Sequence, residues 1–338
     1  MNDVPVLVVA PNWLGDAVMA LPALADIRRH VGTARIVVAA RPSVAPLYTM
    51  APCVDEVVTV PRRGALLAGT AAGTAILFPN SFTSAWIVRK AGIAERWGYA
   101  SDLRRPLLTR AVRRPRRRMH QGAYYQHLVR ELGIDNGPLE PRVDVPADVV
   151  SAARALLTAH GWDGARPLVA IAPGAAYGTA KRWLPAHFAR LASIVAERRA
   201  HCVLVGSEGD APTTAWVKAA IEGAARDAVI DLAGATPLPV VAGIMSLAAA
   251  CVSNDSGAMH LAAAVGVPLA ALFGPTREDE TSPLMRAGTR AEVLINPVWC
   301  RPCMLRECPI DHRCMTGLSP ERVAGALERL MGRCDGRR

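Results

Sequence analysis

The chain has 338 residues, of which 51% are hydrophobic and 20% are charged. This composition is typical of a folded protein with two hydrophobic cores, and it excludes a disordered chain. The formal net charge of +10, from 39 Lys and Arg against 29 Asp and Glu, predicts an acidic partner: a phosphate-bearing small molecule, nucleic acid or an anionic membrane surface. We read no signal peptide and no bilayer-spanning apolar run, so we expect a cytoplasmic protein.

Apolar runs alternate with helical patterns along the chain. In the first half we expect strands at residues 6–10, 36–40, 57–60 and 75–78. A second series is expected at residues 168–172, 202–205, 229–232, 249–253 and 268–273. Apolar strands separated by helices are typical of parallel sheets covered on both faces.

The two series predict an α/β protein with two Rossmann-like domains, residues 1–150 and 151–338, joined by a linker near 141–167. Substrate clefts in such proteins lie at the carboxyl ends of the strands. A last helix is expected at 319–331, where it could pack back on the N-terminal domain.

Residues 110–120 contain six arginines and no acidic residue. A solvated basic loop and an anion-binding segment are both consistent with this pattern. We expect the segment to follow the third or fourth strand of the first sheet.

The loop after the first strand has one ionisable side chain, Asp16. An Asp that opens a helix is often only a cap. A carboxylate at this place could also accept the proton of a sugar hydroxyl during group transfer. The residues alone leave both interpretations open.

Two later loops have the chemistry of anion sites. In residues 173–183, Gly174 and Gly178 would let backbone N–H groups approach a phosphate, Thr179 offers a hydroxyl and Lys181 a positive charge. The spacing is not that of a Walker A loop. In residues 254–260, Ser256 and the backbone of Gly257 open an Ala-rich helix, while His260 is either a phosphate donor or a buried core histidine.

Four stretches, at residues 11–22, 78–85, 173–185 and 254–275, resemble the ADP-heptose:lipopolysaccharide heptosyltransferases (glycosyltransferase family 9), and among them the type II enzymes. Residues 120–134 are similar to the domain-linking region of that family. The resemblance implies a GT-B fold and an inverting transfer of heptose from ADP-L-glycero-D-manno-heptose to the heptosyl-Kdo inner core of lipopolysaccharide. It also implies that catalysis needs no metal cofactor.

The resemblance also assigns roles to residues. It implies that Asp16 is the catalytic base and that an anionic lipopolysaccharide-core acceptor is bound by Asn12, Trp13, Asn80, Ser81, Arg116, Arg117, Arg118 and His120. The ADP-heptose donor would be bound by Gly174, Thr179, Lys181, Glu208, Asp255, Ser256, Gly257 and His260, with Asp210 as an alternative to Glu208. Peripheral contact with the cytoplasmic face of the inner membrane would fit this acceptor, and no nucleic acid partner is expected.

Cys300, Cys303, Cys308 and Cys314 form a C-x2-C-x4-C-x5-C array. The first pair has the spacing of a zinc half-site, although the later spacings match no standard zinc finger or ferredoxin. A structural zinc or iron ion and a set of packing thiols, disulfide-bonded under oxidation, are therefore both open.

Two other functions compete with heptosyl transfer. A sugar-nucleotide epimerase could use the same scaffold, but we find no second acid/base signature for it. A nucleic-acid-binding protein could use the arginines, but the sequence lacks a recognised reading motif. A related transferase acting on a protein or a small metabolite is the nearest alternative.

Overall fold

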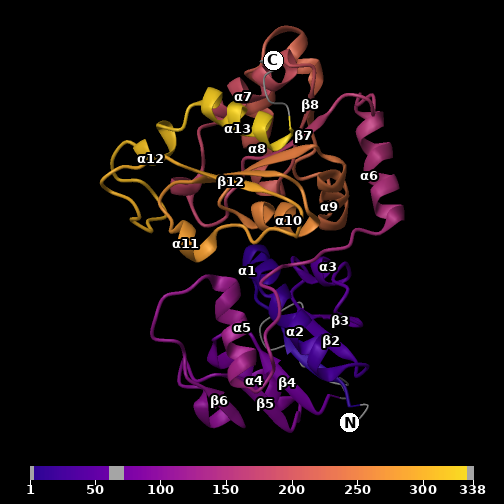
Figure 1. Cartoon of the computed structure of the whole chain (residues 1–338), viewed down its shortest axis with the longest axis vertical. Coiled ribbons are helices and arrows are strands. Elements are labelled where there is room, and N and C mark those ends of the chain that lie inside the picture. The colour runs from indigo at the N-terminus through magenta and orange to yellow at the C-terminus, as the bar shows by residue number, and fades with distance from the viewer. Residues whose placement is uncertain (1–3, 61–71, 333–338) are drawn as a thin grey trace. The chain divides into compact units, whose positions relative to one another are not determined.

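The computed structural model describes residues 4–60 and 72–332 and divides into two compact units, Met1–Asp144 and Val145–Arg338 (Figure 1). Each unit contains one six-stranded sheet in which every paired strand is parallel. The strand orders are β3-β2-β1-β4-β5-β6 and β12-β11-β10-β7-β8-β9. Counted from the first strand of each unit, both follow the Rossmann order 3-2-1-4-5-6.

The strands of the first unit are β1 Val6–Val9, β2 Ile36–Ala40, β3 Glu56–Thr59, β4 Thr74–Leu77, β5 Glu95–Tyr99 and β6 Arg110–Val112. Its helices are α1 Leu14–Met19, α2 Leu21–Val31, α3 Ala45–Tyr48, α4 Phe82–Lys90 and α5 Gln121–Glu131, with a 3₁₀ turn η1 at Arg105–Leu107. Alternate strand side chains, such as Leu7 and Ala75, form a buried core with Ala85 and Val88 of α4.

The strands of the second unit are β7 Leu168–Ala172, β8 His201–Leu204, β9 Val229–Asp231, β10 Ala250–Asn254, β11 Leu269–Phe273 and β12 Ala291–Ile295. Its helices are α6 Ala147–Ala159, α7 Pro185–Glu197, α8 Ala211–Ala219, α9 Leu238–Leu247, α10 Gly257–Val265, α11 Glu278–Thr281, α12 Arg313–Thr316 and α13 Pro320–Leu330, with 3₁₀ turns η2 Thr179–Lys181, η3 Glu208–Asp210 and η4 Gly223–Ala228. Helix α13 packs into the core of this unit beside α7, while α6 packs against α9.

The nine predicted strands are all present, and the structure adds β5, β6 and β12. The segment that we predicted as a linker contains helix α6. Our placement of the arginine-rich segment was wrong, because it follows the fifth strand of the chain, and its first three residues are the edge strand β6 rather than a loop. Strands β5, β6 and β12 carry charged or exposed side chains, so the pattern of apolar runs did not predict them.

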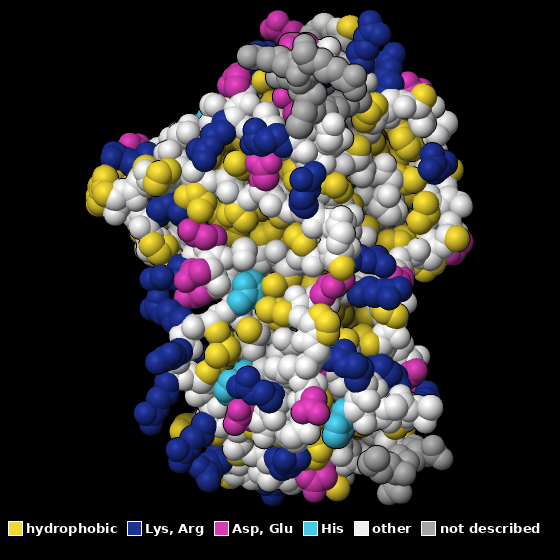
Figure 2. Space-filling view, viewed as in Figure 1, with side chains coloured by type: hydrophobic (Ala, Val, Ile, Leu, Met, Phe, Trp, Pro, Cys, Tyr) yellow, Lys and Arg dark blue, Asp and Glu magenta, His cyan; other side chains and the backbone are white. Residues whose placement is uncertain are grey.

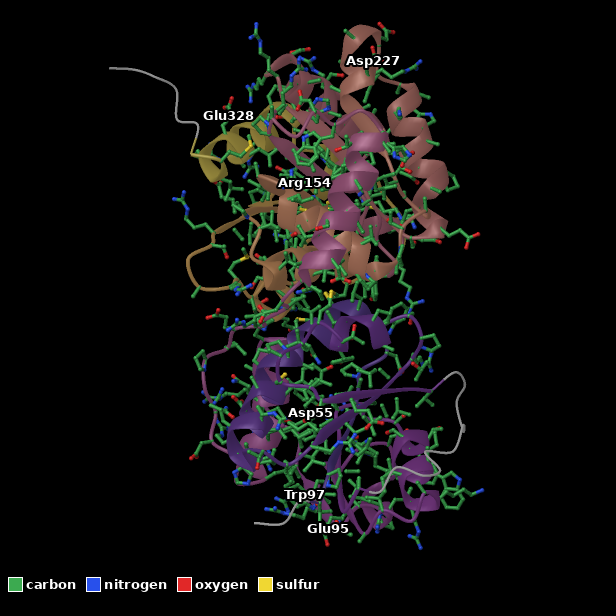
Figure 3. The ribbon with its side chains drawn as sticks, turned by 90° about the vertical axis from the view of Figure 1, so that its right-hand side faces the viewer. Asp55, Glu95, Trp97, Arg154, Asp227 and Glu328 are labelled. Carbon is green, nitrogen blue, oxygen red and sulfur yellow. The ribbon has the colours of Figure 1, made fainter. Side chains whose placement is uncertain are left out.

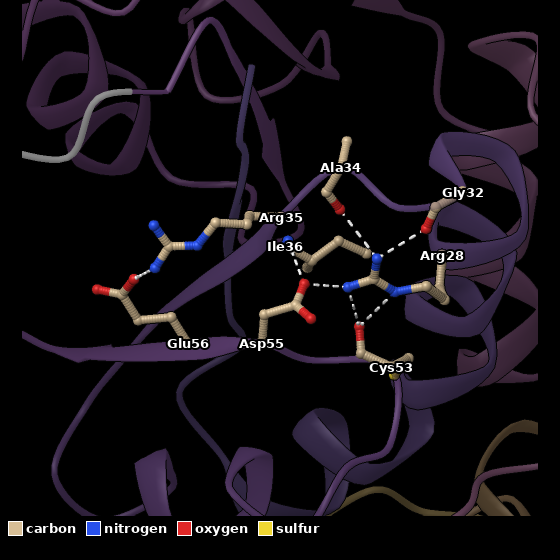
Figure 4. Close-up of polar contacts among 8 residues, drawn as sticks. All are labelled: Arg28, Gly32, Ala34, Arg35, Ile36, Cys53, Asp55 and Glu56. Carbon is tan, nitrogen blue, oxygen red and sulfur yellow. Dashed lines mark hydrogen bonds and ion pairs between the residues drawn. The ribbon is translucent and has the colours of Figure 1, made fainter. Parts of the chain in front are cut away.

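The edge of the first sheet is held by an arginine of α2 (Figure 4). Arg28 forms an ion pair with Asp55, and the Asp55 carboxylate accepts a hydrogen bond from the backbone N–H of Ile36 (2.7 Å). The same guanidinium donates to the carbonyls of Gly32, Ala34 and Cys53. Arg28 thereby fastens the start of β2 and the approach to β3 to the helix that precedes them.

Candidate functional site

In each unit the connections change direction beside its first strand. β1 lies between β2 and β4, and β7 lies between β8 and β10. Open parallel sheets bind ligands outside the carboxyl ends of the strands at such switch points. The loops after these strands carry Asp16 and Asn80 in the first unit, and Lys181 and Asp255 in the second. The fold therefore gathers the predicted residues into one candidate site per unit.

Asp16 lies in the first turn of α1, directly after the loop that follows β1. The N-cap position is occupied by Trp13, which makes no side-chain cap hydrogen bond, so Asp16 is not the N-cap residue. Asn12 and Trp13 are exposed next to it, the latter at 62%. The carboxylate is partly exposed, as access to a substrate hydroxyl requires.

The charge of Asp16 contributes to the pKa of two buried tyrosine hydroxyls. Burial, the nearby Cys53 and Asp16 raise the pKa of Tyr48, and burial followed by Asp16 raises the pKa of Tyr125. Both hydroxyls therefore stay protonated over the physiological range. Asp16 is partly exposed, and its charge acts on two neutral, buried hydroxyls.

The predicted acceptor residue Asn80 belongs to a hydrogen-bonded cluster. Its Nδ2 donates to the hydroxyl of Tyr124 on α5 (3.0 Å), and Nε of Arg114 donates to the same hydroxyl (3.1 Å). The next residue, Ser81, caps α4 by accepting a bond from the N–H of Ser84. The loop after β4 and the arginine-rich segment therefore meet at Tyr124.

The arginine-rich segment is exposed along its length. All six of its arginines are exposed: Arg110, Arg113, Arg114, Arg116, Arg117 and Arg118. Figure 2 shows Lys and Arg side chains gathered along the left edge of the lower unit, where Figure 1 draws the connection from β6 to α5. The segment begins at a strand that is held in place. The guanidinium of Arg110 stacks on the ring of Trp97 (4.6 Å), and Trp97 donates a hydrogen bond to Glu95 (2.9 Å). Glu95 and Trp97, both in β5, are labelled in Figure 3.

His120 has a local role in this structure. It occupies the N-cap of α5, where its Nδ1 accepts a hydrogen bond from the N–H of Gly122 (3.1 Å). The predicted contact of His120 with the acceptor stays a prediction.

Lys181 and Asp255 form the central contact of the second site. Lys181 Nζ lies 2.7 Å from Asp255 Oδ2, and the two side chains are 13% and 4% exposed. The hydroxyl of Thr276 donates to the same carboxylate oxygen (2.6 Å). A desolvated pair of this kind is held in one geometry, because separating the charges leaves each without compensation.

The glycines of the loop after β7 lie against other parts of the protein. A Cβ on Gly174 would lie 2.4 Å from Cγ of Asp210, and a Cβ on Gly178 would lie 2.3 Å from the carbonyl oxygen of Arg306. Both glycines therefore make room for other parts of the protein at these contacts. Their predicted contact with a phosphate stays a prediction.

The loop after β10 is tied to the loop after β7 by Asn254. Its carboxamide donates to the carbonyl of Pro173 (2.7 Å) and accepts from the N–H of Trp183 (3.1 Å). Ser256 is the N-cap of α10, and its hydroxyl lies 3.1 Å from that of Ser253 rather than on the helix backbone. Gly257 follows as the first residue of α10, whereas His260 is 4% exposed. The donor roles of Ser256, Gly257 and His260 stay predictions.

Glu208 and Asp210 have separate environments in η3. Asp210 accepts hydrogen bonds from both the N–H and the hydroxyl of Ser207 (2.9 and 2.7 Å), which makes it part of a capping box. Glu208 is exposed. Of the two acids, Glu208 has the carboxylate that is accessible to a ligand.

The segment from Cys300 to Cys314 packs on the loop of Lys181. Cys314 is buried, Cys300 and Cys308 are partly buried, Cys303 is exposed, and all four are free thiols. Burial, followed by the nearby Cys300, Cys308 and Cys303, raises the pKa of Cys314 to about 11. Within residues 4–60 and 72–332, no three His, Cys, Asp or Glu side chains are grouped to hold a metal ion. The zinc or iron site suggested by the cysteine spacing stays a prediction.

Several residues of these sites had no signal in the sequence. Tyr124, Thr276 and Tyr177 act through contacts with residues far away in the chain. Arg104 is fully buried beneath the Asn80 loop, where it donates to the carbonyl of Ser81 (3.3 Å), and burial lowers its pKa to about 10. That this arginine is buried can be recognised only once the fold is known.

Two Rossmann-like units, with a carboxylate at one switch point and a lysine paired with a buried aspartate at the other, are the arrangement of a glycosyltransferase of the GT-B class. The sequence model of glycosyltransferase family 9 (heptosyltransferase) matches residues 64–313. The chain belongs to this family and is a glycosyltransferase. The GT-B class of two Rossmann-like domains expected from the sequence is confirmed.

Named relatives agree with this placement. The chain is 32% identical to lipooligosaccharide heptosyltransferase 2 of Haemophilus influenzae, over 84% of this chain and 87% of the relative. It is 29% identical to lipopolysaccharide heptosyltransferase 2 of Escherichia coli, over 96% and 98%. The solved structure of E. coli ADP-heptose LPS heptosyltransferase II superposes with a TM-score of 0.84 at 29% identity, covering 97% of this chain and 98% of that one. A family 9 glycosyltransferase of Veillonella parvula shares the fold, with a TM-score of 0.83 at 20% identity over 99% of both chains.

None of the helices in the part of the chain that the structure describes is long and apolar enough to cross a membrane.

Proposed function

We propose that this protein transfers heptose from ADP-L-glycero-D-manno-heptose to the heptosyl-Kdo inner core of lipopolysaccharide, with inversion and without a catalytic metal. The observation that carries the proposal is the buried Lys181–Asp255 pair at the switch point of the second sheet. The names of the relatives, which specify heptosyltransferases acting on lipopolysaccharide or lipooligosaccharide, supply the sugar and the acceptor.

In the proposed reaction, Asp16 takes the proton of the acceptor hydroxyl as that oxygen attacks the anomeric carbon of heptose. The bond between this carbon and the β-phosphate oxygen breaks, and ADP leaves with the electron pair. Lys181 stabilises the charge that develops on the diphosphate. A base on the face opposite the leaving group gives inversion at the anomeric carbon.

We assign one substrate to each unit from the chemistry of its side chains. We assign acceptor binding to the N-terminal domain, residues 1–150, because it contains Asp16, Asn80 and the exposed arginines. Donor binding is assigned to residues 151–338, where Lys181 and the accessible Glu208 lie. Arginine pairs well with the carboxylates and phosphates of an acidic core acceptor.

The same arginines could also bind the anionic cytoplasmic face of the inner membrane. Basic side chains near an anionic leaflet contribute about 1 kcal/mol each to binding. Binding to vesicles of anionic lipid, compared with vesicles of neutral lipid, tests this peripheral contact.

A transfer assay tests the proposed function. Purified protein is mixed with the ADP-linked heptose and an acceptor that ends in one heptose, and the product is measured by mass spectrometry. One added heptose and one released ADP are expected. An acceptor that ends in Kdo should react far more slowly, and transfer to it alone would contradict the proposed acceptor.

The alternatives give different products in that assay. An epimerase would change the sugar nucleotide with no acceptor present, and a related transferase would be active only with a protein or a small metabolite. Either result, without transfer to the lipopolysaccharide core, would replace the proposal.

A structural zinc or iron held by the cysteine segment is a second interpretation of Cys300, Cys303, Cys308 and Cys314. The proximity of three thiols to Cys314 favours it, although the thiols would have to close around one ion. Elemental analysis of protein purified without chelator tests it. About one ion per chain would support the site, and trace amounts would exclude it.

A further inference from the structure

Two cationic side chains make cation–π contacts with the ring of Tyr177, in the loop after β7. Lys181 Nζ lies 4.9 Å from the ring centroid, and the guanidinium carbon of Arg306 lies 5.2 Å from it. The two positive charges are therefore no farther apart than the Debye length of about 10 Å at 0.1 M salt. Arg306 comes from the cysteine segment, 125 residues along the chain from Lys181.

The backbone holds the two segments together at this point. The carbonyl of Arg306 accepts a hydrogen bond from the N–H of Ala180 (2.9 Å), directly before Lys181, and it contacts Gly178 so closely that no Cβ would fit there. The hydroxyl of Tyr177 donates to the carbonyl of Met304 (3.0 Å). The position of the Arg306 Cα is thus set by the same loop that positions Lys181.

A further hydrogen bond holds the C-terminal end of the cysteine segment, residues 300–314. Nε2 of His312 lies 2.6 Å from the carbonyl oxygen of Ala180, to which it donates in the Nε2–H tautomer. The segment therefore contacts the Lys181 loop before and after Cys308. Its path across the loop is defined by several hydrogen bonds.

The charges around Lys181 leave a diphosphate in need of another cation. Lys181 is paired with Asp255, which offsets part of the positive charge that Lys181 can offer to a diphosphate. Arg301, at the start of the same segment, is compensated by Glu278 (2.8 Å). Arg306 is exposed and has no carboxylate partner among residues 4–60 and 72–332.

We propose that Arg306 is a donor-binding residue, whose guanidinium contacts the diphosphate of the ADP-linked sugar beside Lys181. The cysteine segment is then one wall of the donor site, and its role is to present this arginine. The inference rests on the proposed donor site of the second unit. It adds a residue to which the resemblance assigned no role.

Titration calorimetry with ADP and with AMP tests the assignment in four variants: Arg306→Gln, Arg306→Lys, Lys181→Ala and Arg313→Gln. Arg313 is the matched control, because it is a partly exposed arginine of the same segment that pairs with its neighbour Asp311 (2.8 Å). Thermal unfolding of each variant checks that the fold is retained.

We expect Arg306→Gln to weaken ADP binding about ten- to hundredfold, as removal of a charge-assisted hydrogen bond does. AMP binding should change less, because AMP lacks the β-phosphate. Arg306→Lys should keep part of the affinity, and Arg313→Gln should bind ADP like the unmodified protein.

Two results separate the inference from the function on which it rests. If Lys181→Ala loses affinity for ADP while Arg306→Gln retains it, the role of Arg306 is wrong and the donor site stands. If both variants bind ADP like the unmodified protein, the donor site itself is misplaced and the inference is overturned with it.

Discussion

The two units have the same strand order but different chemistry at the switch point. In the second unit, Lys181 and Asp255 are withdrawn from solvent and locked together. In the first, Asp16 is partly exposed beside neutral phenols, and the arginines of the basic segment are exposed to water. One topology can therefore carry a fixed, desolvated charge pair or an open, polar surface, depending on which side chains follow the strands.

This difference suits the two proposed substrates. A nucleotide diphosphate is small and constant in shape, so a rigid site can match it. A lipopolysaccharide core is large and carries many anionic groups, so exposed cations on long side chains can reach several of them. The following variants alter one unit at a time.

The largest effect is expected from Asp16→Asn. Loss of a general base lowers kcat about 10²–10⁴-fold. ADP affinity should be unchanged, because the predicted donor residues all lie in the other unit. Steady-state kinetics and ADP calorimetry on the same preparation measure both quantities, and unaltered turnover would remove Asp16 from the mechanism.

Asp255→Ala should lower the free energy of unfolding of the second unit by up to about 3 kcal/mol, because Lys181, only 13% exposed, loses its carboxylate partner. The double variant Asp255→Ala with Lys181→Met should recover part of this loss. Urea unfolding monitored by tryptophan fluorescence provides the comparison. Equal stability of the single and double variants would show that the pair is not desolvated in solution.

Replacement of Arg116, Arg117 and Arg118 together by glutamine tests the open surface of the first unit. Exposed ion pairs contribute about 0.2–1 kcal/mol each, so the acceptor KM should rise roughly tenfold. The dependence of this KM on salt should flatten as well. A rise in the donor KM instead would reverse the assignment of the two units.

The smallest effect is a pH dependence from His127 on α5. Burial lowers the pKa of His127; Glu131 opposes this shift and Arg130 adds to it. The folded protein thus favours the neutral ring, and its contribution to stability is complete above the unfolded pKa of about 6.5 and declines as the pH falls below it. Thermal unfolding at a series of pH values should show a modest loss on acidification, and His127→Gln should reduce that loss.

The strands and most of the chemistry-bearing loops could be predicted from the sequence alone. Strands covered on both faces must be apolar throughout, as in residues 36–40 and 168–172, which are fully buried. The last two strands on the β6 side of the first sheet do not follow this rule. Both β5 and β6 begin with exposed charged residues, and the apolar pattern does not mark them.

The contacts within the proposed donor site were decided by the tertiary structure. The sequence identified Lys181 and Asp255 separately, but only the adjacency of β7 and β10 brings their loops together. The groups that fill the space beside Gly174 and Gly178 come from Asp210 and Arg306, far away in the chain, and the sequence did not indicate them. Residue type and local spacing report what a side chain can do, whereas its partner depends on which distant segments the sheet order places beside it.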